Sequence, residues 1–253
     1  MTKDYTIDRS PISLVDFYGK SNVFAIQIYG NYFNADIRAI ALSVRWNGTS
    51  KIQCTIDVNA VITSSDTITP SCYAVGSFPN GLLLINNGKI IGKGGNGGTN
   101  YGGFWSPGDP GFNGGTGLFL ETAQTTILNN GIIAGGGGGG GACGSPSSDA
   151  SYFAQSGGGG GGAGYGLGGQ TGASLWGANG TLTNGGSGGI GYDGHNGGGG
   201  GNLGLSGGAG GQGANGGALG GAGGYPGNSI DGGTRIISWG PNGPGLIYGT
   251  VAG

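Results

Sequence analysis

The sequence predicts an all-β N-terminal domain followed by a glycine-rich sandwich of packed polyglycine II helices with variable loops, and little or no α-helix. Three observations carry this prediction: strand-like segments before residue 80, 71 glycines among 253 residues, and a glycine period of three after residue 185. Glycine loses the most backbone freedom on folding, so a run of it is a linker unless packing offsets that loss. The period of three favours packing, since a linker has no reason to keep it.

Composition divides the chain into four expected regions: an N-terminal segment (1–20), a β domain (21–80), the glycine sandwich (81–230) and a C-terminal strand or tail (231–253). In the β domain, "NVFAIQIYGNYF", "DIRAIALSVRW" and "KIQCTIDVNAVIT" are rich in β-branched and aromatic residues, which is typical of strands. Asn47-Gly48 lies between the last two of these segments and predicts a hairpin turn.

A repeated phrase opens the glycine-rich part. "INNGKIIGKGGNGG" begins at Ile85 and "LNNGIIAGGGGGGG" at Leu128. Each reads as a short apolar strand broken at Asn-Asn-Gly and followed by glycine. We expect these two strands to form the edge from which the glycine stack starts.

Periodicity indicates how the glycines pack. Glycine occupies every third position from 185 to 200 and from 204 to 216, and the frame then shifts by one to 217, 220 and 223. A polyproline II-type helix has three residues per turn and no internal hydrogen bonds, so several must bond laterally to one another. A helix enclosed on all sides has room for glycine alone, which places 135–141 and 157–162 in the middle of the stack.

The segments between glycine runs differ in character from the runs themselves. Residues 99–113, 142–156, 170–184 and 190–196 carry large side chains and are expected to gather at the ends of the stack. Exposed aromatic residues on a rigid scaffold are typical of a recognition surface. The other interpretation is that the rings fold back and cover the ends of the stack. The candidate binding residues are Tyr101, Phe104, Trp105, Phe112, Tyr152, Phe153, Leu175, Trp176, Tyr192 and His195.

Several function classes are disfavoured. No Lys or Arg occurs between Lys93 and Arg235, so this region has no basic surface for nucleic acid. His195 is the only histidine and the acidic residues are scattered, so we expect no enzyme site, no metal and no cofactor. The sequence offers no transmembrane segment and no secretory signal. Cys54, Cys72 and Cys143 lack a CxxC pattern and indicate synthesis in a reducing cytosol; pairing of Cys54 with Cys72 stays open.

The combination of "GKGGNGG", "NNGIIAGGGGGGGA" and "GGGGGGAG" with aromatic loops resembles the distal tail-fibre adhesins of T-even-like bacteriophages, over about residues 82–230. The resemblance implies a virion protein whose loops bind a host outer-membrane protein. "SPISLVDFYGKS" and "ADIRAIALSVRWNGTS" look more like the N-terminal module of minor tail and tail-tip proteins of other tailed phages. From its position before the first clear strand and its apolar composition, we expect the first segment to dock to a tail-fibre or tail-tip protein. The apolar docking residues would be Ile12, Leu14, Val15 and Phe17.

Two further hypotheses remain at this stage. An ice-binding or other surface protein on the same lattice would need a flat repetitive face, which irregular aromatic loops do not provide. A structural tail component without receptor binding is the other alternative.

Overall fold

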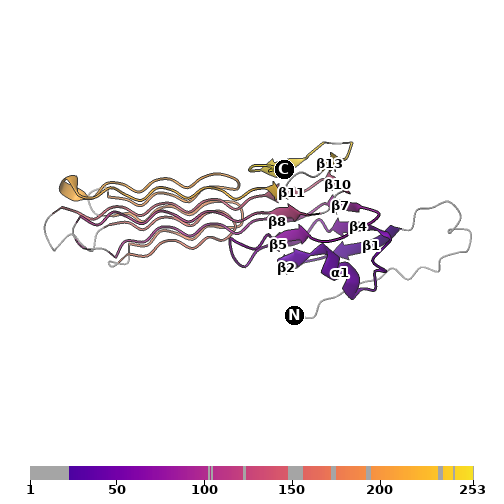
Figure 1. Ribbon diagram of the computed structural model, residues 1–253. Helices are drawn as coiled ribbons and strands as arrows, with labels where there is room; N and C mark the ends of the chain where they lie inside the picture. Colours follow the sequence, from indigo (N-terminus) through magenta and orange to yellow (C-terminus); the bar gives the residue numbers. More distant parts are fainter. Residues whose placement is uncertain are drawn as a thin grey trace, which may run out of the picture.

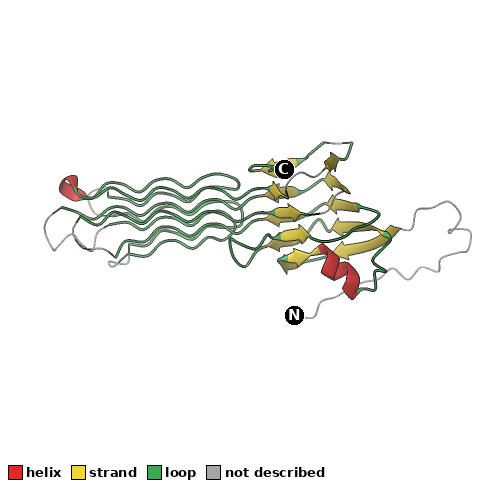
Figure 2. Cartoon of the chain, in the orientation of Figure 1, coloured by secondary structure: helices red, strands yellow, loops and turns green. Residues whose placement is uncertain are grey.

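The computed structural model describes residues 23–101, 103, 105–121, 124–147, 156–171, 175–191, 195–232, 236–241 and 243–252. Short strands stack at one end of the molecule, and long extended segments run side by side away from them (Figure 1). The nearly all-β fold that the sequence predicts is confirmed (Figure 2). The strands are β1 (Val23–Ile28), β2 (Asn31–Phe33), β3 (Ala35–Asp36), β4 (Lys51–Ile56), β5 (Val61–Thr63), β6 (Cys72–Ala74), β7 (Leu82–Asn86), β8 (Lys89–Ile91), β9 (Leu118–Leu120), β10 (Gln124–Asn129), β11 (Ile132–Ala134), β12 (Ile230–Asp231), β13 (Ile236–Trp239) and β14 (Leu246–Tyr248).

The strands build a solenoid with three faces. Their sheets have the orders β1-β4-β7-β10-β13, β14-β11-β8-β5-β2 and β12-β9-β6-β3. All of these pairs are parallel, because each coil of the chain adds one strand to each sheet in turn. Strands β7 to β14 therefore belong to the same sheets as β1 to β6, and the solenoid continues past residue 80, where the composition changes.

The two copies of the repeated sequence phrase occupy equivalent positions in two successive coils. Ile85 pairs with Leu128 and Asn86 pairs with Asn129. Asn-Asn-Gly forms the corner between the first and second sheets, so each phrase is two strands on different faces and not one broken strand. The buried Asn86 amide donates to Asn129 Oδ1 at 2.7 Å and to the Ile132 carbonyl at 3.1 Å. This amide ladder satisfies polar groups that burial would otherwise leave without partners.

Columns of apolar side chains fill the solenoid. Ile52 pairs with Leu82, and Cys54, Leu84 and Ile127 stack in register across three coils. All of these side chains are at most 1% exposed. Burial alternates along β4 and β7, because one face of each sheet points into the solenoid and the other points outward. Cys54, Cys72 and Cys143 are buried and free, so the open question of a Cys54–Cys72 bridge is answered.

The single described α-helix covers the first coil. Helix α1 (Ile37–Ser43) begins after Asp36, whose carboxylate accepts from the Arg38 and Ala39 N–H groups at 2.9 and 3.0 Å. The strand expected over "DIRAIALSVRW" was wrong, because Ile37, Ile40 and Ala41 follow helical spacing and form the buried face.

The hairpin expected at Asn47-Gly48 was also wrong. The Asn47 side chain instead accepts from the Thr49 and Ser50 N–H groups and closes a turn between α1 and β4. Strand β4 then pairs with β1 in parallel, so the chain crosses over through the helix and does not fold back on itself.

Extended glycine-rich segments, here called rods, leave the solenoid between its second and third faces. Rods 1 and 2 lie between β8 and β9, and the others lie between β11 and β12. They run away from the sheets to the far end of the molecule (Figure 1). Within the described residues the rods are 92–100, 106–117, 135–145, 156–164, 166–170, 175–181, 184–190, 195–202, 204–213 and 217–228, numbered 1 to 10 in that order.

Hydrogen bonding between rods repeats every three residues. The N–H groups of rod 3 point to rods 2, 4 and 9 in rotation, and its carbonyls point to rods 10, 1 and 8. Within one turn, the N–H groups of three successive residues donate to carbonyls of three different rods. These bonds are Gly139 to Phe112 at 2.9 Å, Gly140 to Gly160 at 2.8 Å and Gly141 to Gly208 at 2.9 Å. This is the repeat of the threefold helix expected from the sequence; the assignment of each rod to the polyglycine II conformation stays a prediction.

The hydrogen bonds arrange the rods in three layers. Rods 2, 1 and 5 form one outer layer, rods 9, 8 and 7 the other, and rods 10, 3, 4 and 6 the middle. Rods 3 and 4 each bond to six others: rods 1, 2, 4, 8, 9 and 10 for rod 3, and rods 1, 3, 5, 6, 7 and 8 for rod 4. The predicted central position of 135–141 and 157–162 is therefore confirmed.

The glycine runs 135–141 and 157–162 of the enclosed rods have no space for a side chain. A Cβ on Gly138 would lie 2.0 Å from the Gly224 carbonyl oxygen, and one on Gly162 would lie 2.0 Å from that of Gly137. In the outer layer, a Cβ on Gly199 would meet no heavy atom closer than 3.7 Å. Glycine is therefore a steric requirement in these two enclosed runs and not at every position of the outer layers.

Asparagine side chains complete the bonding at the surface of the sandwich. Each accepts from an N–H group on a neighbouring rod or loop that no carbonyl of the lattice reaches. Examples are Asn96 to Leu167 N at 3.0 Å, Asn179 to Gly168 N at 2.8 Å and Asn202 to Gly185 N at 3.0 Å. Side chains thus extend at the rim the ladder that the backbone makes inside.

Candidate functional site

The chain reverses direction five times at the end of the sandwich farthest from the sheets. The reversals join rods 1 and 2, 3 and 4, 5 and 6, 7 and 8, and 9 and 10 (Figure 1). We call this end the tip. The last reversal contains the 3₁₀ turn η4 (Ala214–Gly216), where Asn215 has φ of 52°. Of the four expected loops, residues 101, 103, 105, 146, 147, 171 and 191 lie between rods at this end. The other described residues of these segments belong to rods, except 182–183, which lie at the opposite end.

Backbone and polar side chains tie these reversals together. The Trp105 N–H donates to the Pro146 carbonyl at 3.1 Å, and the Ser147 N–H donates to that of Ala214 at 3.3 Å. The Ser147 hydroxyl also donates to the Asn215 carbonyl at 2.9 Å. The first, second and fifth reversals therefore form one connected surface.

The third and fourth reversals are attached to the same surface. The Tyr101 hydroxyl donates to Gln170 Oε1 at 3.0 Å, which links the first reversal to the third. His195 Nδ1 lies 2.9 Å from the Gln212 carbonyl oxygen, and Gln212 Nε2 donates to Gly217, which links the fourth to the fifth. His195 is thus a loop contact, as its position in the sequence suggests.

Buried polar groups support the tip from beneath. Asn100, 7% exposed, donates from Nδ2 to the Cys143 carbonyl at 2.6 Å and to Ser145 Oγ at 3.2 Å. It joins the end of rod 1 to the end of the enclosed rod 3. Side chains held by such networks keep a defined geometry, which lowers the entropy lost on binding.

Three of the predicted aromatic residues are exposed at or next to the tip. Tyr101, Trp105 and Trp176 are 65%, 60% and 56% exposed. Trp105 has φ of 58°, an uncommon conformation for a bulky residue that its neighbours must hold in place. These rings stand out from the lattice and do not cover it, so the interpretation of them as a lid is not supported.

The other predicted residues fall into two groups. Leu175 is half-buried and already belongs to rod 6, since its carbonyl accepts from Gly158 at 3.0 Å. Phe112 lies on the flank of rod 2 and not in a loop, because its N–H and carbonyl both bond within the lattice. The candidates Phe104, Tyr152, Phe153, Tyr192, Ile12, Leu14, Val15 and Phe17 lie outside the described residues.

One exposed residue beside the tip was missed. Ile190, 78% exposed, precedes the fourth reversal, but the sequence analysis singled out mainly aromatic residues. A usable signal for the fifth reversal was present in the sequence, since the glycine frame shifts between 216 and 217, where rod 9 gives way to rod 10.

Among the described residues, no three His, Cys, Asp or Glu side chains come close enough together to hold a metal ion. No helix within that part of the chain has the length and apolar character needed to cross a membrane. Burial raises the pKa of the Cys143 thiol beneath the tip to about 11, so it stays protonated and unreactive at neutral pH.

Comparisons with known proteins agree with this arrangement. The family model described as "Phage tail fibre adhesin Gp38" matches residues 23–253, including residues 23–80, which the sequence analysis likened to other phage proteins. A search of curated proteins gave no match. Among solved structures, the fold is similar to a chain of the gp37–gp38 adhesin tip complex of the bacteriophage S16 long tail fibre. That match has 24% identity and a TM-score of 0.61 over 96% of this chain and 88% of the other.

Proposed function

The chain belongs to the family of Gp38 phage tail fibre adhesins, and we propose that it attaches the virion to its host by binding a receptor on the cell surface through the tip. The observation that supports this most is the convergence of five reversals on one end of a rigid lattice, with Tyr101, Trp105 and Trp176 exposed there. Large aromatic residues contribute most of the free energy at many protein interfaces. Binding in this proposal involves no catalytic step and no cofactor.

The receptor in this proposal is an outer-membrane protein of a Gram-negative host. The resemblance to T-even-like adhesins supports that class of receptor. The tip supports it physically, because its described surface presents aromatic rings and polar loop groups with neither Lys nor Arg between Lys93 and Arg235. Such a surface suits the loops of a folded protein better than a polyanion.

Substitution of the exposed rings tests the role of the tip. Trp105→Ala and Trp176→Ala should each reduce adsorption of the purified protein to host cells about tenfold or more, since truncating an interface anchor often costs about 2 kcal/mol. The melting temperature should stay close to wild type, because the lattice that holds the fold lies beneath these rings. Host strains lacking single outer-membrane proteins then identify the receptor.

Tyr225→Ala is the matched control. Tyr225 is 72% exposed but lies in rod 10 on the flank of the sandwich, away from the reversals. It should leave adsorption unchanged. Equal losses in all three variants, or a lowered melting temperature that accompanies the loss in the tryptophan variants, would refute the assignment of the tip as the binding surface.

At the opposite end, we propose that the chain attaches to a tail-fibre protein at the distal end of the fibre. The structurally similar chain comes from a complex of two tail-fibre proteins, which supports a partner of this kind. Residues 1–20, with Ile12, Leu14, Val15 and Phe17, are the proposed docking segment and precede the family match. Deleting them should preserve binding to cells and remove the protein from assembled particles. Normal incorporation of the truncated protein would contradict this part of the proposal.

A purely structural role in the tail is the second candidate. It predicts that the purified protein neither binds host cells nor competes with the phage for adsorption. The adsorption measurements above therefore distinguish the two functions directly.

A further inference from the structure

The third sheet of the solenoid carries an aromatic ladder on its outer face. Tyr73 pairs with Phe119 in register, and these two are flanked by Asp36 on β3 and Asp231 on β12. The residues on either side of them along each strand are buried in the solenoid, so these four side chains point outward. Two rings between two carboxylates are an unusual outer face for a protein in which only 8% of residues are charged.

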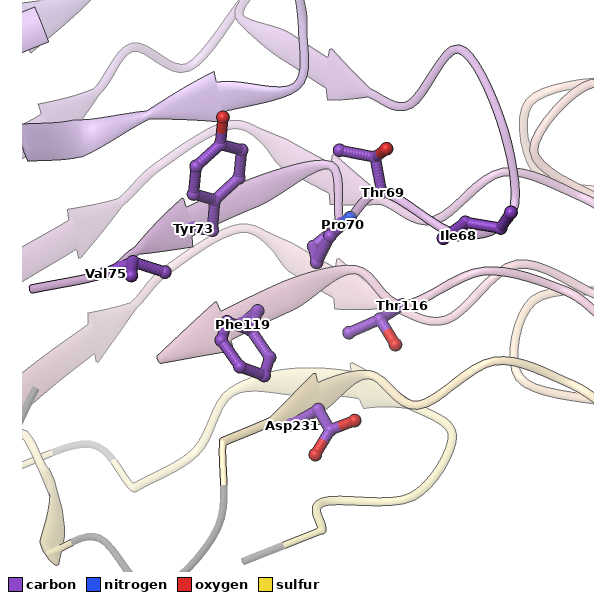
Figure 3. A pocket seen from close by; sticks show the side chains of 8 residues that line it. All are labelled: Ile68, Thr69, Pro70, Tyr73, Val75, Thr116, Phe119 and Asp231. Atoms are coloured by element: carbon purple, nitrogen blue, oxygen red, sulfur yellow. The ribbon is translucent and has the colours of Figure 1, made fainter. Parts of the chain in front are cut away.

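A cavity of about 430 Å³ opens over this face. Figure 3 shows its eight lining residues: Tyr73, Phe119 and Asp231 from neighbouring strands of the third sheet, the threonines Thr69 and Thr116, and the apolar residues Ile68, Pro70 and Val75. Its volume lies within the usual range for small-molecule sites. The lining is mostly apolar, from two aromatic rings and three aliphatic side chains, and also carries two threonine hydroxyls and one carboxylate. A ligand that has both apolar faces and polar groups fits it better than a fully apolar one.

The loop that forms one wall is held firmly. Asp66 accepts from the N–H groups of Ile68 and Thr69 at 2.9 and 2.7 Å. Ser64 Oγ donates to the Thr69 carbonyl at 2.7 Å, and Asn34 Nδ2 donates to the Pro70 carbonyl at 3.1 Å. The cavity wall is therefore preformed, and little ordering is needed when a ligand enters.

Asp231 restricts the kind of ligand. Its oxygens accept from Asn228 Nδ2 at 3.2 Å and from the Gly232 N–H at 2.8 Å, which fixes the carboxylate in place. No residue in the cavity lining is Lys or Arg. An apolar segment laid over the cavity would bury this charge without a cation, which is costly, whereas hydroxyl donors of a ligand would satisfy its remaining acceptor sites.

We propose that this cavity is a carbohydrate-binding site. A pyranose ring has C–H groups on its faces, which pack on aromatic rings, and hydroxyl groups at its edge, which bond to carboxylates and hydroxyls. Tyr73 and Phe119 provide the ring surfaces, and Asp231, Thr69 and Thr116 provide the polar partners.

If the tip binds a receptor as proposed above, the location of the cavity would let it bind surface polysaccharide of the same cell. Thr116 belongs to the end of rod 2 next to the solenoid, so the cavity lies at the root of the rods and the tip lies at their other end. A rod as long as 135–145 extends roughly 30 Å at about 3.1 Å per residue. Polysaccharide that projects from a cell surface by that distance would reach the cavity while the tip holds its receptor, and the two contacts would reinforce each other.

The test is binding of purified bacterial surface polysaccharides, and of neutral and amino mono- and disaccharides, to the full chain, followed by ligand-observed NMR and calorimetry. Saturable binding is expected. It should weaken at least tenfold in Phe119→Ala and in the isosteric Asp231→Asn and Thr116→Val variants, with melting temperatures near wild type. Phe33→Ala is the matched control, since Phe33 is a 66% exposed phenylalanine on β2, in a different sheet.

Absence of saturable binding to every saccharide, or binding that Phe119→Ala leaves intact, would overturn the proposal. Capture of a Lys- or Arg-bearing fibre protein that Asp231→Asn abolishes would also overturn it and assign the cavity to a protein partner. Failure of the tip proposal is separate, because Trp105→Ala and Trp176→Ala should not change saccharide binding to the isolated chain.

Discussion

The solenoid and the glycine sandwich are stabilised by different interactions. The solenoid buries columns of apolar side chains such as Cys54, Leu84 and Ile127, and its strands bond to two neighbours at most. The middle layer of the sandwich buries hardly any side chains, and its enclosed rods bond to six neighbours each. Stability therefore comes mainly from apolar burial in one region and from backbone hydrogen bonding at close approach in the other. The two regions should respond to opposite kinds of substitution.

The largest effect is expected where a side chain is added to an enclosed rod. Gly138→Ala puts a methyl group 2.0 Å from the Gly224 carbonyl oxygen, so rod 10 must move away. That displacement breaks several bonds of the kind that joins Gly224 N–H to the Gly139 carbonyl, at about 1 kcal/mol each, and propagates along both rods. We expect no cooperatively folded protein, as judged by calorimetry and soluble yield.

The same change in the outer layer is the control. Gly199 has φ outside the left-handed range and no heavy atom within 3.4 Å of an added Cβ. Gly199→Ala should melt near wild type or slightly above it, because alanine reduces the freedom of the unfolded chain. Equal tolerance of both variants would mean that the enclosed packing does not exist in solution.

The opposite substitution, from large to small, should have the next largest effect in the solenoid. Leu84 is 0% exposed in the middle of three stacked coils. Leu84→Ala should lower the free energy of unfolding by about 2–5 kcal/mol while the protein still folds. Denaturant unfolding measures it. A smaller loss here than in a surface position such as Leu219→Ala would contradict the assignment of the core.

Replacing a buried asparagine of the solenoid and an exposed asparagine of the sandwich should lower the free energy of unfolding by different, smaller amounts. Asn86→Ala removes a buried ladder and leaves Asn129 Oδ1 without its donor, which should cost about 1–3 kcal/mol. Asn96→Ala removes an exposed acceptor from the Leu167 N–H, which water can replace, and should cost less than about 1 kcal/mol. Comparable losses would show that the rim of the sandwich excludes water as the solenoid does.

The smallest expected effect is a local loss of stability around Asp66 at acid pH. Hydrogen bonds from the Thr69 and Ile68 N–H groups hold the pKa of Asp66 below its usual value of 3.8. A lowered folded-state pKa means that the stabilisation is present above the unfolded-state pKa and is lost as the pH falls through the folded-state value. Opening of residues 64–69 should therefore increase only below about pH 4. The protection factor of the Thr69 amide, which is its exchange rate corrected for the intrinsic pH dependence of exchange, measures this. A pH-independent protection factor would exclude the role given to Asp66.

Much of the glycine sandwich could be predicted from the sequence, because its packing depends on the absence of side chains. An uninterrupted glycine run such as 135–141 is compatible with full enclosure, and a period of three fixes the repeat of the hydrogen-bond partners. The aromatic segments could be assigned to the ends for the same reason, since they do not fit inside. Phe112 was misplaced because a large side chain is also tolerated on the outer side of an outer rod.

The solenoid was much less predictable. Its strands are two to six residues long, so their alternation over such lengths does not distinguish a parallel coil from a hairpin. The Asp36 cap and the helical spacing after it were present in the sequence, but the β-branched residues of the same segment outweighed them. The fourth reversal falls within 190–196, which its large side chains assigned to an end of the stack although the glycine period continues through residues 188, 191, 194 and 197.

The sequence by itself determined that the chain is nearly all β, that its glycine runs are packed and that bulky residues gather between them, because these follow from local size and spacing. Only the tertiary structure decided that Ile85 stacks on Leu128 in successive coils, that the rods are insertions into a solenoid, and which rods bond to one another. Those facts depend on pairings between residues far apart in the chain, which local spacing does not record. The cavity beside Phe119 could not be predicted from local spacing for the same reason, since its lining is assembled from several coils.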